Sequence, residues 1–279
     1  MQGKTVVITG ATSGIGEVAA ARLAEMGATI LFVARDRARA ETTLKRLAAK
    51  SAAPHRYYEA DLSRLAEMKR VGAEIAADSP RIDVLVNNAG AMFSSRNVTA
   101  DGLEMTFALN HMSYFVLTNA LLDKLKASAP ARIVNTASAA HLGAKLDFDD
   151  LQGERNYSGF RAYGRSKLCN ILFTRELARR LQGTGVTANC LHPGFVATRF
   201  GDQSGGMIGR LFPFFKLFGR SPDKGGDTIV YLASSPEVAS DSGLYFFDRR
   251  KTTPSAAAQD DEAARKLWTD SARLAGFSD

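Results

Sequence analysis

Thr5-Val6-Val7-Ile8-Thr9-Gly10-Ala11-Thr12-Ser13-Gly14-Ile15-Gly16 is the stretch that decides the fold. Its first five residues form a short apolar, β-branched run, which is typical of a buried strand. The glycines that follow permit a tight turn, and they let backbone amides approach a pyrophosphate at the positive terminus of the next helix. A glycine cluster alone is often only a turn, so the rest of the chain has to support this interpretation.

Outward from this junction, apolar strand-like runs alternate with helix-like stretches. We expect strands at residues 5–9, 29–34, 55–61, 84–87, 132–136, 186–191 and 243–247, and helices at residues 17–25, 37–50, 68–77, 107–125 and 163–181. Near-continuous apolar strands alternating with helices indicate a parallel sheet that is covered on both faces. The pattern predicts an α/β fold: a single Rossmann-like, doubly wound domain over residues 1–279, with about seven strands.

Two insertions interrupt the alternation, near residues 141–160 and 199–220. Insertions that follow sheet strands line the ligand crevice in such folds, so we expect both to contribute to a substrate pocket. Apolar side chains in or beside them predict an apolar pocket: Leu142, Leu146, Phe195, Phe200 and Phe212. Residues 207–220 leave two interpretations open, a lid helix that packs on the pocket or an amphipathic helix in peripheral contact with a membrane.

Composition excludes several classes of function. The net charge of +7 raises the question of nucleic acid, but the basic residues are scattered and accompany no nucleic-acid motif, so we expect none. Cys169 and Cys190 lie in apolar surroundings, and His141 and His192 have no second ligand at a useful spacing, so no metal site is expected. The sequence shows no signal peptide and no apolar run of the ~20 residues that a spanning helix needs, which predicts a cytoplasmic protein.

The end of the second expected strand, Val33-Ala34-Arg35-Asp36, addresses the choice of cofactor. An acid at this place binds the ribose hydroxyls of NAD, whereas a base receives the 2′-phosphate of NADP. Arg35 offers a planar fork for a phosphate, and Ser13 could add a hydroxyl contact. NADP(H) is therefore favoured, while NAD(H) stays open because a shift of two residues would make Asp36 the ribose acid.

Two further strand ends fall on the same edge of the predicted sheet. Asp61-Leu62 follows the third strand, and Asn87-Asn88-Ala89-Gly90 follows the fourth. Asp61 is suited to accept a hydrogen bond from the adenine amine. The Asn-Asn-Ala-Gly turn either holds backbone for the cofactor or simply ends the strand.

Tyr163 and Lys167 stand four residues apart, so on a helix they project from the same face. A nearby ammonium favours phenolate and lowers the pKa of a tyrosine from its reference of about 10. Such a pair is suited to alcohol–carbonyl interconversion if a hydride carrier is bound. Taken alone it is a weak signal, because a surface helix can carry the same spacing.

With these motifs in order along the chain, the sequence resembles the classical short-chain dehydrogenase/reductase family. The matching motifs are residues 9–16, Asp61, residues 87–90, Asn110, Ser138, Tyr163, Lys167 and Pro193-Gly194. Residues 34–36, 135–141, 166–170 and 192–194 make it most similar to the retinol dehydrogenase-like and WW-domain oxidoreductase-like branch. Animal retinol dehydrogenases often carry an N-terminal membrane anchor, which this sequence lacks, so retinoid specificity does not follow from the resemblance.

The resemblance implies a catalytic set and a cofactor site. Tyr163 would exchange a proton with the substrate oxygen, Lys167 would lower its pKa and bind the nicotinamide ribose, and Ser138 would polarise the carbonyl. Asn110 would hold a water that connects Lys167 to solvent. The implied cofactor-binding residues are Gly10, Thr12, Ser13, Gly14, Ile15, Gly16, Arg35, Asp61, Leu62, Asn88, Ala89, Gly90, Tyr163, Lys167, Pro193, Gly194, Val196 and Thr198.

The sequence thus predicts an NADP(H)-dependent oxidoreductase that interconverts a lipophilic alcohol and its aldehyde or ketone. The competing hypothesis is an NAD(P)-sensing regulatory or scaffold protein on the same fold. The resemblance also implies a homo-oligomer, formed through the fourth and fifth expected helices.

Overall fold

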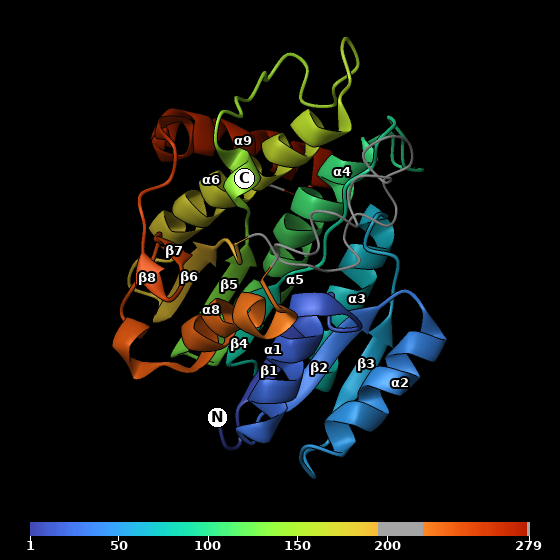
Figure 1. Cartoon of the computed structure of the whole chain (residues 1–279), viewed down its shortest axis with the longest axis vertical. Helices are drawn as coiled ribbons and strands as arrows, with labels where there is room; N and C mark the ends of the chain where they lie inside the picture. Colours follow the sequence, from blue (N-terminus) through green and yellow to red (C-terminus); the bar gives the residue numbers. More distant parts are fainter. Residues whose placement is uncertain (195–219, 278–279) are drawn as a thin grey trace.

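The computed structural model describes residues 1–194 and 220–277, and it shows a twisted sheet covered by helices on both faces (Figure 1). The described strands lie in the order β3-β2-β1-β4-β5-β6-β7-β8. They are β1 (Thr5–Thr9), β2 (Thr29–Ala34), β3 (Arg56–Glu59), β4 (Val84–Asn87), β5 (Ala131–Thr136), β6 (Val186–Leu191), β7 (Tyr245–Phe247) and β8 (Arg250–Lys251). All pairs are parallel except β7 with β8. The predicted α/β, Rossmann-like fold is confirmed.

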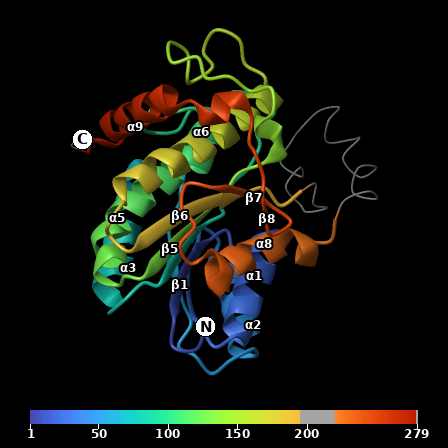
Figure 2. The same cartoon turned by 90° about the vertical axis from the view of Figure 1, so that its left-hand side faces the viewer.

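The helices form two layers. Their bounds are α1 (Gly14–Glu25), α2 (Arg37–Ala48), α3 (Leu65–Asp78), α4 (Met105–Phe107), α5 (Ser113–Ala127), α6 (Gly159–Arg180), α8 (Pro222–Ser234) and α9 (Asp261–Ala275). Shorter helical segments are η1 (Ala108–Met112), η2 (Ala139–His141), η4 (Pro236–Val238) and η5 (Ala256–Gln259). One apolar core lies under α1 and α8, and the other under α3, α5, α6 and α9 (Figures 1 and 2).

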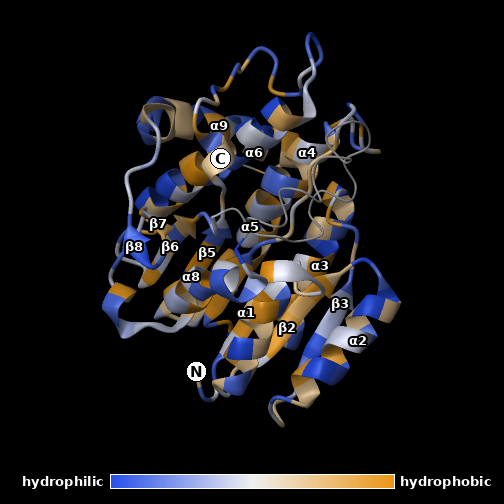
Figure 3. Ribbon diagram, in the orientation of Figure 1, coloured by the Kyte–Doolittle hydropathy of each residue, from blue (hydrophilic) through white to orange (hydrophobic). Residues whose placement is uncertain are grey.

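The apolar pattern explains why the strands lie inside these layers. β1 and β4 alternate their side chains between the two cores, so that Val6 and Ile8 join one core and Val7 joins the other. A strand that is buried on both faces has to be apolar throughout, and Figure 3 shows this concentration of hydrophobic residues on the central strands. Because β1 pairs with β2 on one side and β4 on the other, the chain reverses its winding at the carboxyl end of β1.

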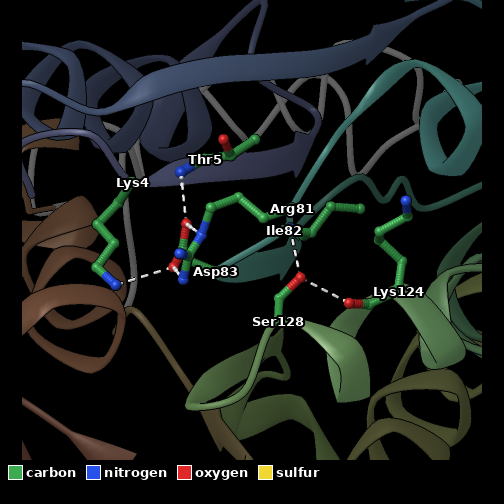
Figure 4. Close-up of polar contacts among 7 residues, drawn as sticks. All are labelled: Lys4, Thr5, Arg81, Ile82, Asp83, Lys124 and Ser128. Atoms are coloured by element: carbon green, nitrogen blue, oxygen red, sulfur yellow. Dashed lines mark hydrogen bonds and ion pairs between the residues drawn. The ribbon is translucent and has the colours of Figure 1, made fainter.

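At the opposite end of the sheet, the buried carboxylate of Asp83 links β1 to β4 (Figure 4). Asp83, next to β4, accepts hydrogen bonds from the Thr5 amide at 2.9 Å and the Lys4 ammonium at 2.9 Å, and it also pairs with Arg81. The neighbouring Ile82 amide donates to the Ser128 hydroxyl at 2.9 Å, which ties this edge to the end of α5. These contacts fix β1 relative to β4, and therefore fix the crevice at their carboxyl ends.

The sequence analysis missed three features of the fold. The described residues contain eight strands rather than about seven, because Asp248 and Arg249 turn the chain into β8 with φ values of 48° and 60°. A two-residue hairpin needs such positive φ values and usually signals them with Gly or Asn, so this turn carried no sequence signal. The helices α8 and α9 were also not predicted. Finally, the expected helix at residues 107–125 contains the π-helical segment η1.

The C-terminal helix α9 lies on α6 and reaches α5 (Figure 2). The Trp268 ring contacts Phe115 and Phe173, with ring centroids 5.0 Å and 5.8 Å apart, and Arg180 lies over the same ring. This helix therefore packs mainly on α6, one of the two helices through which the resemblance implied assembly. Separately, no helix within residues 1–194 and 220–277 is long and apolar enough to cross a membrane.

Candidate active site

The glycine-rich turn after β1 is folded closely against the end of β4. Gly10 and Gly14 have φ values of 70° and 59°, in the left-handed region that favours glycine. A Cβ added at Gly10 would lie 2.8 Å from Nδ2 of Asn88, and one added at Gly16 would lie 2.2 Å from the Gly10 carbonyl oxygen. Side chains at positions 10 and 16 would therefore push the turn away from β4, so the glycines are required by close backbone approach.

Asn88 joins the carboxyl ends of three strands. Its side-chain amide donates to the carbonyls of Thr9 and Gly10 at 3.2 and 3.3 Å, and its Oδ1 accepts from the Thr136 hydroxyl at 3.3 Å. The Thr9 hydroxyl in turn accepts from the backbone amides of Asn88 and Ala89 at 2.9 and 3.0 Å. The Asn-Asn-Ala-Gly turn thus both ends its strand and holds the glycine-rich turn in place.

At the end of β2, two adjacent charged residues differ in their ion pairing. Asp36 is the N-cap of α2: its carboxylate accepts from the Arg39 amide at 2.9 Å and lies 3.9 Å from the Arg39 guanidinium. Arg35 is exposed at the same strand end, and it forms no ion pair with any residue in the described part of the chain. The sequence left the role of Asp36 open, and the structure shows that its carboxylate caps α2.

Asp61 follows β3 and stiffens its own loop. Its Oδ1 accepts from the amide and the hydroxyl of Ser63 at 3.0 and 2.8 Å, in the manner of an Asx turn. Leu62 is buried between them. Asp61 is only half-buried, so part of its carboxylate remains accessible at the sheet edge.

The structure brings Ser138, Tyr163 and Lys167 together at the carboxyl end of β5. Ser138 caps η2, where its hydroxyl accepts from the Ala140 amide at 3.1 Å, and a hydrogen bond joins its side chain to Tyr163. One turn along α6, Lys167 is buried, and its ammonium lies 5.7 Å from the centre of the Tyr163 ring. The Lys167 ammonium donates to the Thr136 carbonyl at 3.0 Å.

Burial shifts the pKa values of two residues in this group. Burial raises the pKa of Tyr163 to about 12, and the hydrogen bond with Ser138 only partly opposes the rise. Burial also lowers the pKa of Lys167 to about 7. Burial and the hydrogen bond with Ser138 are the causes of the shift in the Tyr163 pKa, and the Lys167 ammonium is not among them, so the expected lowering of this pKa by Lys167 stays a prediction.

Asn110 lies at the centre of the π-helical segment η1 and is fully buried. Its side chain accepts from the Ala91 amide at 2.8 Å, and it donates to the Ala91 carbonyl and the Ser166 hydroxyl, each at 2.9 Å. Asn110 thereby holds the loop after β4 next to Lys167: a Cβ added at Gly90 would lie 3.0 Å from Oδ1 of Asn110 and 3.4 Å from the ammonium of Lys167. Single-turn π-bulges are frequent at functional sites.

After β6, Pro193 and Gly194 reach the same edge of the sheet. Gly194 has a φ of 78°, and its amide donates to Nδ1 of His192 at 3.2 Å. The His192 ring stacks on Phe247 with centroids 4.1 Å apart, and burial lowers its pKa to about 4. His192 therefore acts as a neutral support for this loop. The predicted residues Val196 and Thr198, most of the 199–220 insertion, and the segment 207–219 of the lid or membrane hypothesis lie outside the described residues.

The 141–160 insertion is docked beside the site by groups that sequence reasoning missed. The Tyr157 hydroxyl donates to the Glu104 carboxylate at 3.0 Å and to the Phe93 carbonyl at 3.1 Å. Glu104 is buried and also caps α4. The insertion leaves Leu142 and Phe160 with 63% and 60% exposure, which are the highest values among large apolar side chains in the part of the chain that the structure describes.

A separate cavity of about 290 Å³ lies between α6, β7 and the chain after β8. Its lining includes Arg175, Tyr245, Lys251 and Gln259, and it contains none of the predicted site residues. The predicted catalytic groups therefore lie at the carboxyl ends of the strands and not in this cavity.

Comparison with known proteins agrees with this geometry. The family model for short chain dehydrogenases matches residues 4–207. Human retinol dehydrogenase 13 is 44% identical over 283 residues, which cover 99% of this chain and 85% of that protein. Human retinol dehydrogenase 14 is also 44% identical, over 295 residues that cover 99% of this chain and 88% of that protein.

Solved structures are similar over most of the chain. An uncharacterized protein from Mycobacterium paratuberculosis aligns with a TM-score of 0.80 at 32% identity, covering 99% of this chain and 95% of that one. A short-chain dehydrogenase from Sphingobium yanoikuyae in complex with NADPH aligns with a TM-score of 0.66 at 27% identity, covering 81% and 82%. A short chain dehydrogenase from Burkholderia cenocepacia in complex with NADP aligns with a TM-score of 0.71 at 25% identity, covering 88% of this chain and 96% of that one.

Proposed function

This chain belongs to the short chain dehydrogenase family, in its retinol dehydrogenase-like branch, and on that premise we propose that it reduces a lipophilic aldehyde or ketone with NADPH. It is an oxidoreductase of the retinol dehydrogenase type. The cofactor preference, the substrate and the residue roles below are the proposal. The observation that carries it is the meeting of Ser138, Tyr163 and Lys167 at the carboxyl end of β5, beside the glycine-rich turn.

The residues at the strand ends fit a bound dinucleotide. The glycine-rich turn, which lies close against β4 because Gly10 and Gly16 lack side chains, leads into the N-terminus of α1, and backbone amides at a helix N-terminus are suited to bind a pyrophosphate. Asp61 is placed to accept from an adenine amine. On the cofactor side of the site, Asn88, Ala89 and Gly90 would line the nicotinamide half together with Pro193 and Gly194.

The exposed guanidinium of Arg35 supports NADP(H) over NAD(H). It stands at the end of β2 without an ion pair to a described residue, whereas the neighbouring Asp36 is occupied as the cap of α2. A guanidinium binds a phosphate through two parallel hydrogen bonds, and an unpaired one is available for that contact. The relatives from Sphingobium yanoikuyae and Burkholderia cenocepacia, which were solved with NADPH and NADP, are consistent with this choice.

When bound, the nicotinamide supplies the hydride. The Tyr163 phenol is protonated at neutral pH, because burial raises its pKa to about 12, and it can donate that proton to the substrate oxygen as negative charge develops there. The Ser138 hydroxyl is hydrogen-bonded to Tyr163 and provides a second donor to the same oxygen. Lys167 lies one turn away with a pKa of about 7, so it can exchange a proton near neutrality.

The lipophilic character of the substrate is supported by the rim of the site. Leu142 and Phe160 stay exposed at 63% and 60%, although transfer of such side chains from water is favourable by about 25 cal/mol per Å² of apolar surface. Both belong to the insertion that Tyr157 docks beside the catalytic residues. An apolar substrate would cover this surface.

The test is NADPH-dependent reduction of a series of aldehydes and ketones by the wild-type protein and by Tyr163→Phe. We expect turnover that rises with the length of the apolar chain and falls by at least about 100-fold in Tyr163→Phe, because the proton donor is lost. Tyr231→Phe is the matched control, since Tyr231 on α8 donates a hydrogen bond to Glu237 in η4, away from the site. Tight binding of NADPH without turnover of any carbonyl would favour the regulatory or scaffold protein instead.

A further inference from the structure

One backbone carbonyl beside the site receives three buried donors. The Thr136 carbonyl, at the end of β5, accepts from the Lys167 ammonium at 3.0 Å, the Asn170 amide at 3.3 Å and the Tyr114 hydroxyl at 3.4 Å. Lys167 and Asn170 come from α6, and Tyr114 comes from α5. All three side chains are buried.

Because three donors share the Thr136 carbonyl, the hydrogen bond that the Lys167 ammonium donates to this carbonyl is weakened. A carbonyl oxygen has two lone pairs, so three donors cannot all form full hydrogen bonds to it. Lys167 forms no ion pair with any residue in ranges 1–194 and 220–277, and Thr136 is the acceptor that its ammonium reaches there. In a buried site a hydrogen bond to the charged form stabilises that form, so the availability of this carbonyl controls how well the ammonium is stabilised.

We propose that Asn170 and Tyr114 are positioning residues that act on Lys167 through the Thr136 carbonyl: by sharing this acceptor, they weaken its hydrogen bond to the ammonium and favour the neutral amine. The inference rests on the proposed function, because it explains how Lys167 is prepared for proton exchange. The low pKa of Lys167, about 7 through burial, is consistent with it.

The other groups that face Lys167 are uncharged near pH 7, so the Thr136 carbonyl is the main influence on the charge of its ammonium. Tyr163 on α6 and Tyr114 on α5 are both neutral near pH 7, because burial raises the pKa of each phenol. His111 in η1, which interacts with Asn170, is also neutral, because burial lowers its pKa to about 3. The loop after β4 presents the uncharged Gly90 and Asn110. None of these groups carries a charge that would compete with the Thr136 carbonyl in stabilising the Lys167 ammonium.

The backbone of Asn170 belongs to a buried hydrogen-bond network that includes side chains from β4, β5 and α6. A buried chain of hydrogen bonds runs from Asn87 to Asn135 at 2.9 Å, from Asn135 to the Thr174 hydroxyl at 2.9 Å, and from Thr174 to the Asn170 carbonyl at 2.7 Å. Asn87 also donates to Thr118 at 2.9 Å, at the far end of the chain. Thr118 therefore offers a control position that lies in the same network but does not touch Thr136.

The test is a titration of Lys167 by nuclear magnetic resonance, in protein labelled with carbon-13 at the lysine Cε and with the signal assigned by its loss in Lys167→Met. Asn170→Leu and Tyr114→Phe each remove one competing donor at similar volume. We expect the midpoint of Lys167 to rise by about half a pH unit in each variant, because the ammonium regains the carbonyl. Thr118→Val should leave the midpoint unchanged even where it lowers stability.

An unchanged or lower midpoint in a folded Tyr114→Phe protein would overturn the proposal. Tyr114→Phe removes a single oxygen, so it decides the matter if Asn170→Leu does not fold. The titration needs no substrate and no turnover. Absence of carbonyl reductase activity would thus refute the proposed function, whereas the titration of Lys167 would still test the role of Asn170 and Tyr114.

Discussion

At the scale of single residues, the site depends on which charged groups already have partners. Asp36 and Arg35 are adjacent in sequence, yet the first caps a helix and the second is exposed without a described ion pair. Sequence reasoning placed both at the cofactor edge but could not separate them, because the strand-end register was uncertain by two residues. The hydrogen bond from the Arg39 amide to Asp36 gives this carboxylate a partner within α2, and the assignment of the ribose contact stays a prediction.

Replacement of Arg35 should weaken the binding of NADPH without changing the binding of NADH. We expect Arg35→Ala to weaken NADPH binding by about 10- to 100-fold, the equivalent of roughly 1.5–3 kcal/mol for charge-assisted hydrogen bonds, and to leave NADH binding unchanged. Titration followed by nicotinamide fluorescence measures both affinities. Arg37→Ala is the control, because Arg37 is exposed and paired with Glu41. Equal losses for NADPH and NADH would assign the 2′-phosphate contact to another group.

Asp83 should make stability depend on pH. Burial alone would raise its pKa, but hydrogen bonds from Arg81, the Thr5 amide and Lys4 outweigh burial and lower it. A carboxyl whose pKa is lowered by folding stabilises the protein fully above its unfolded pKa of about 3.9, and that contribution is lost as the pH falls through the lower folded pKa.

We therefore expect Asp83→Asn to cost about 2 kcal/mol of unfolding free energy at pH 7, and the difference from wild type to shrink below about pH 4. Urea denaturation at several pH values measures this difference. The exposed pair of Glu41 with Arg37 gives the control, and Glu41→Gln should cost less than about 0.5 kcal/mol. A penalty that stays constant down to pH 3 would show that the Asp83 charge is not responsible.

At the scale of elements, the sequence predicted the strands whose apolar residues form an uninterrupted run. The bounds of β1, β2, β4 and β6 were predicted to the residue, because each is a buried apolar run that ends at Gly, Pro or a polar turn. The hairpin at Asp248 and Arg249 was missed, since its positive φ values are maintained by tertiary contacts, including the pairing of Asp248 with Arg220. The π-helical segment around Asn110 was missed because hydrogen bonds to Ala91 and Ser166, far away in sequence, accompany it.

The helix α9 should contribute strongly to stability through one side chain. Trp268 is buried against Phe115 and Phe173. We expect Trp268→Ala to lower the unfolding free energy by about 3–5 kcal/mol, from lost burial and the cavity left behind. Arg265→Ala, at an exposed position of the same helix, should change it by less than about 0.5 kcal/mol. If denaturant melts show a loss under 1 kcal/mol for Trp268→Ala, α9 is not a firmly packed part of the fold.

At the scale of the whole molecule, the sheet order explains why residues so distant in sequence meet. The carboxyl ends of β1, β4, β5 and β6 are neighbours in the sheet, so Gly10, Asn88, Ser138 and Gly194 reach one edge, and α6 adds Tyr163 and Lys167. This meeting could be predicted because parallel strands present the same end to one edge. The raised pKa of Tyr163 and the shared Thr136 carbonyl could not, since both depend on burial and three-dimensional contacts.

The packing of α9 bears on assembly. Trp268 and its neighbours occupy the α5–α6 face, and Lys69 lies over the ring of Phe277 just after α9. A homo-oligomer formed through this face would have to displace α9, whose apolar side is buried there. We therefore expect any assembly of this protein to use another surface.

The most direct test of the central claim follows the hydride itself. The purified protein would be supplied with NADPH that carries deuterium at the reactive face of the nicotinamide C4, together with a long-chain aldehyde, and the product would be analysed by mass spectrometry. Each of the two C4 positions would be labelled in turn, so that transfer from either face of the nicotinamide is detected. The account predicts an alcohol with one deuterium on its carbinol carbon from one of the two labelled cofactors, and none from Tyr163→Phe in the same time. No alcohol, or an alcohol without deuterium from either cofactor, would contradict it.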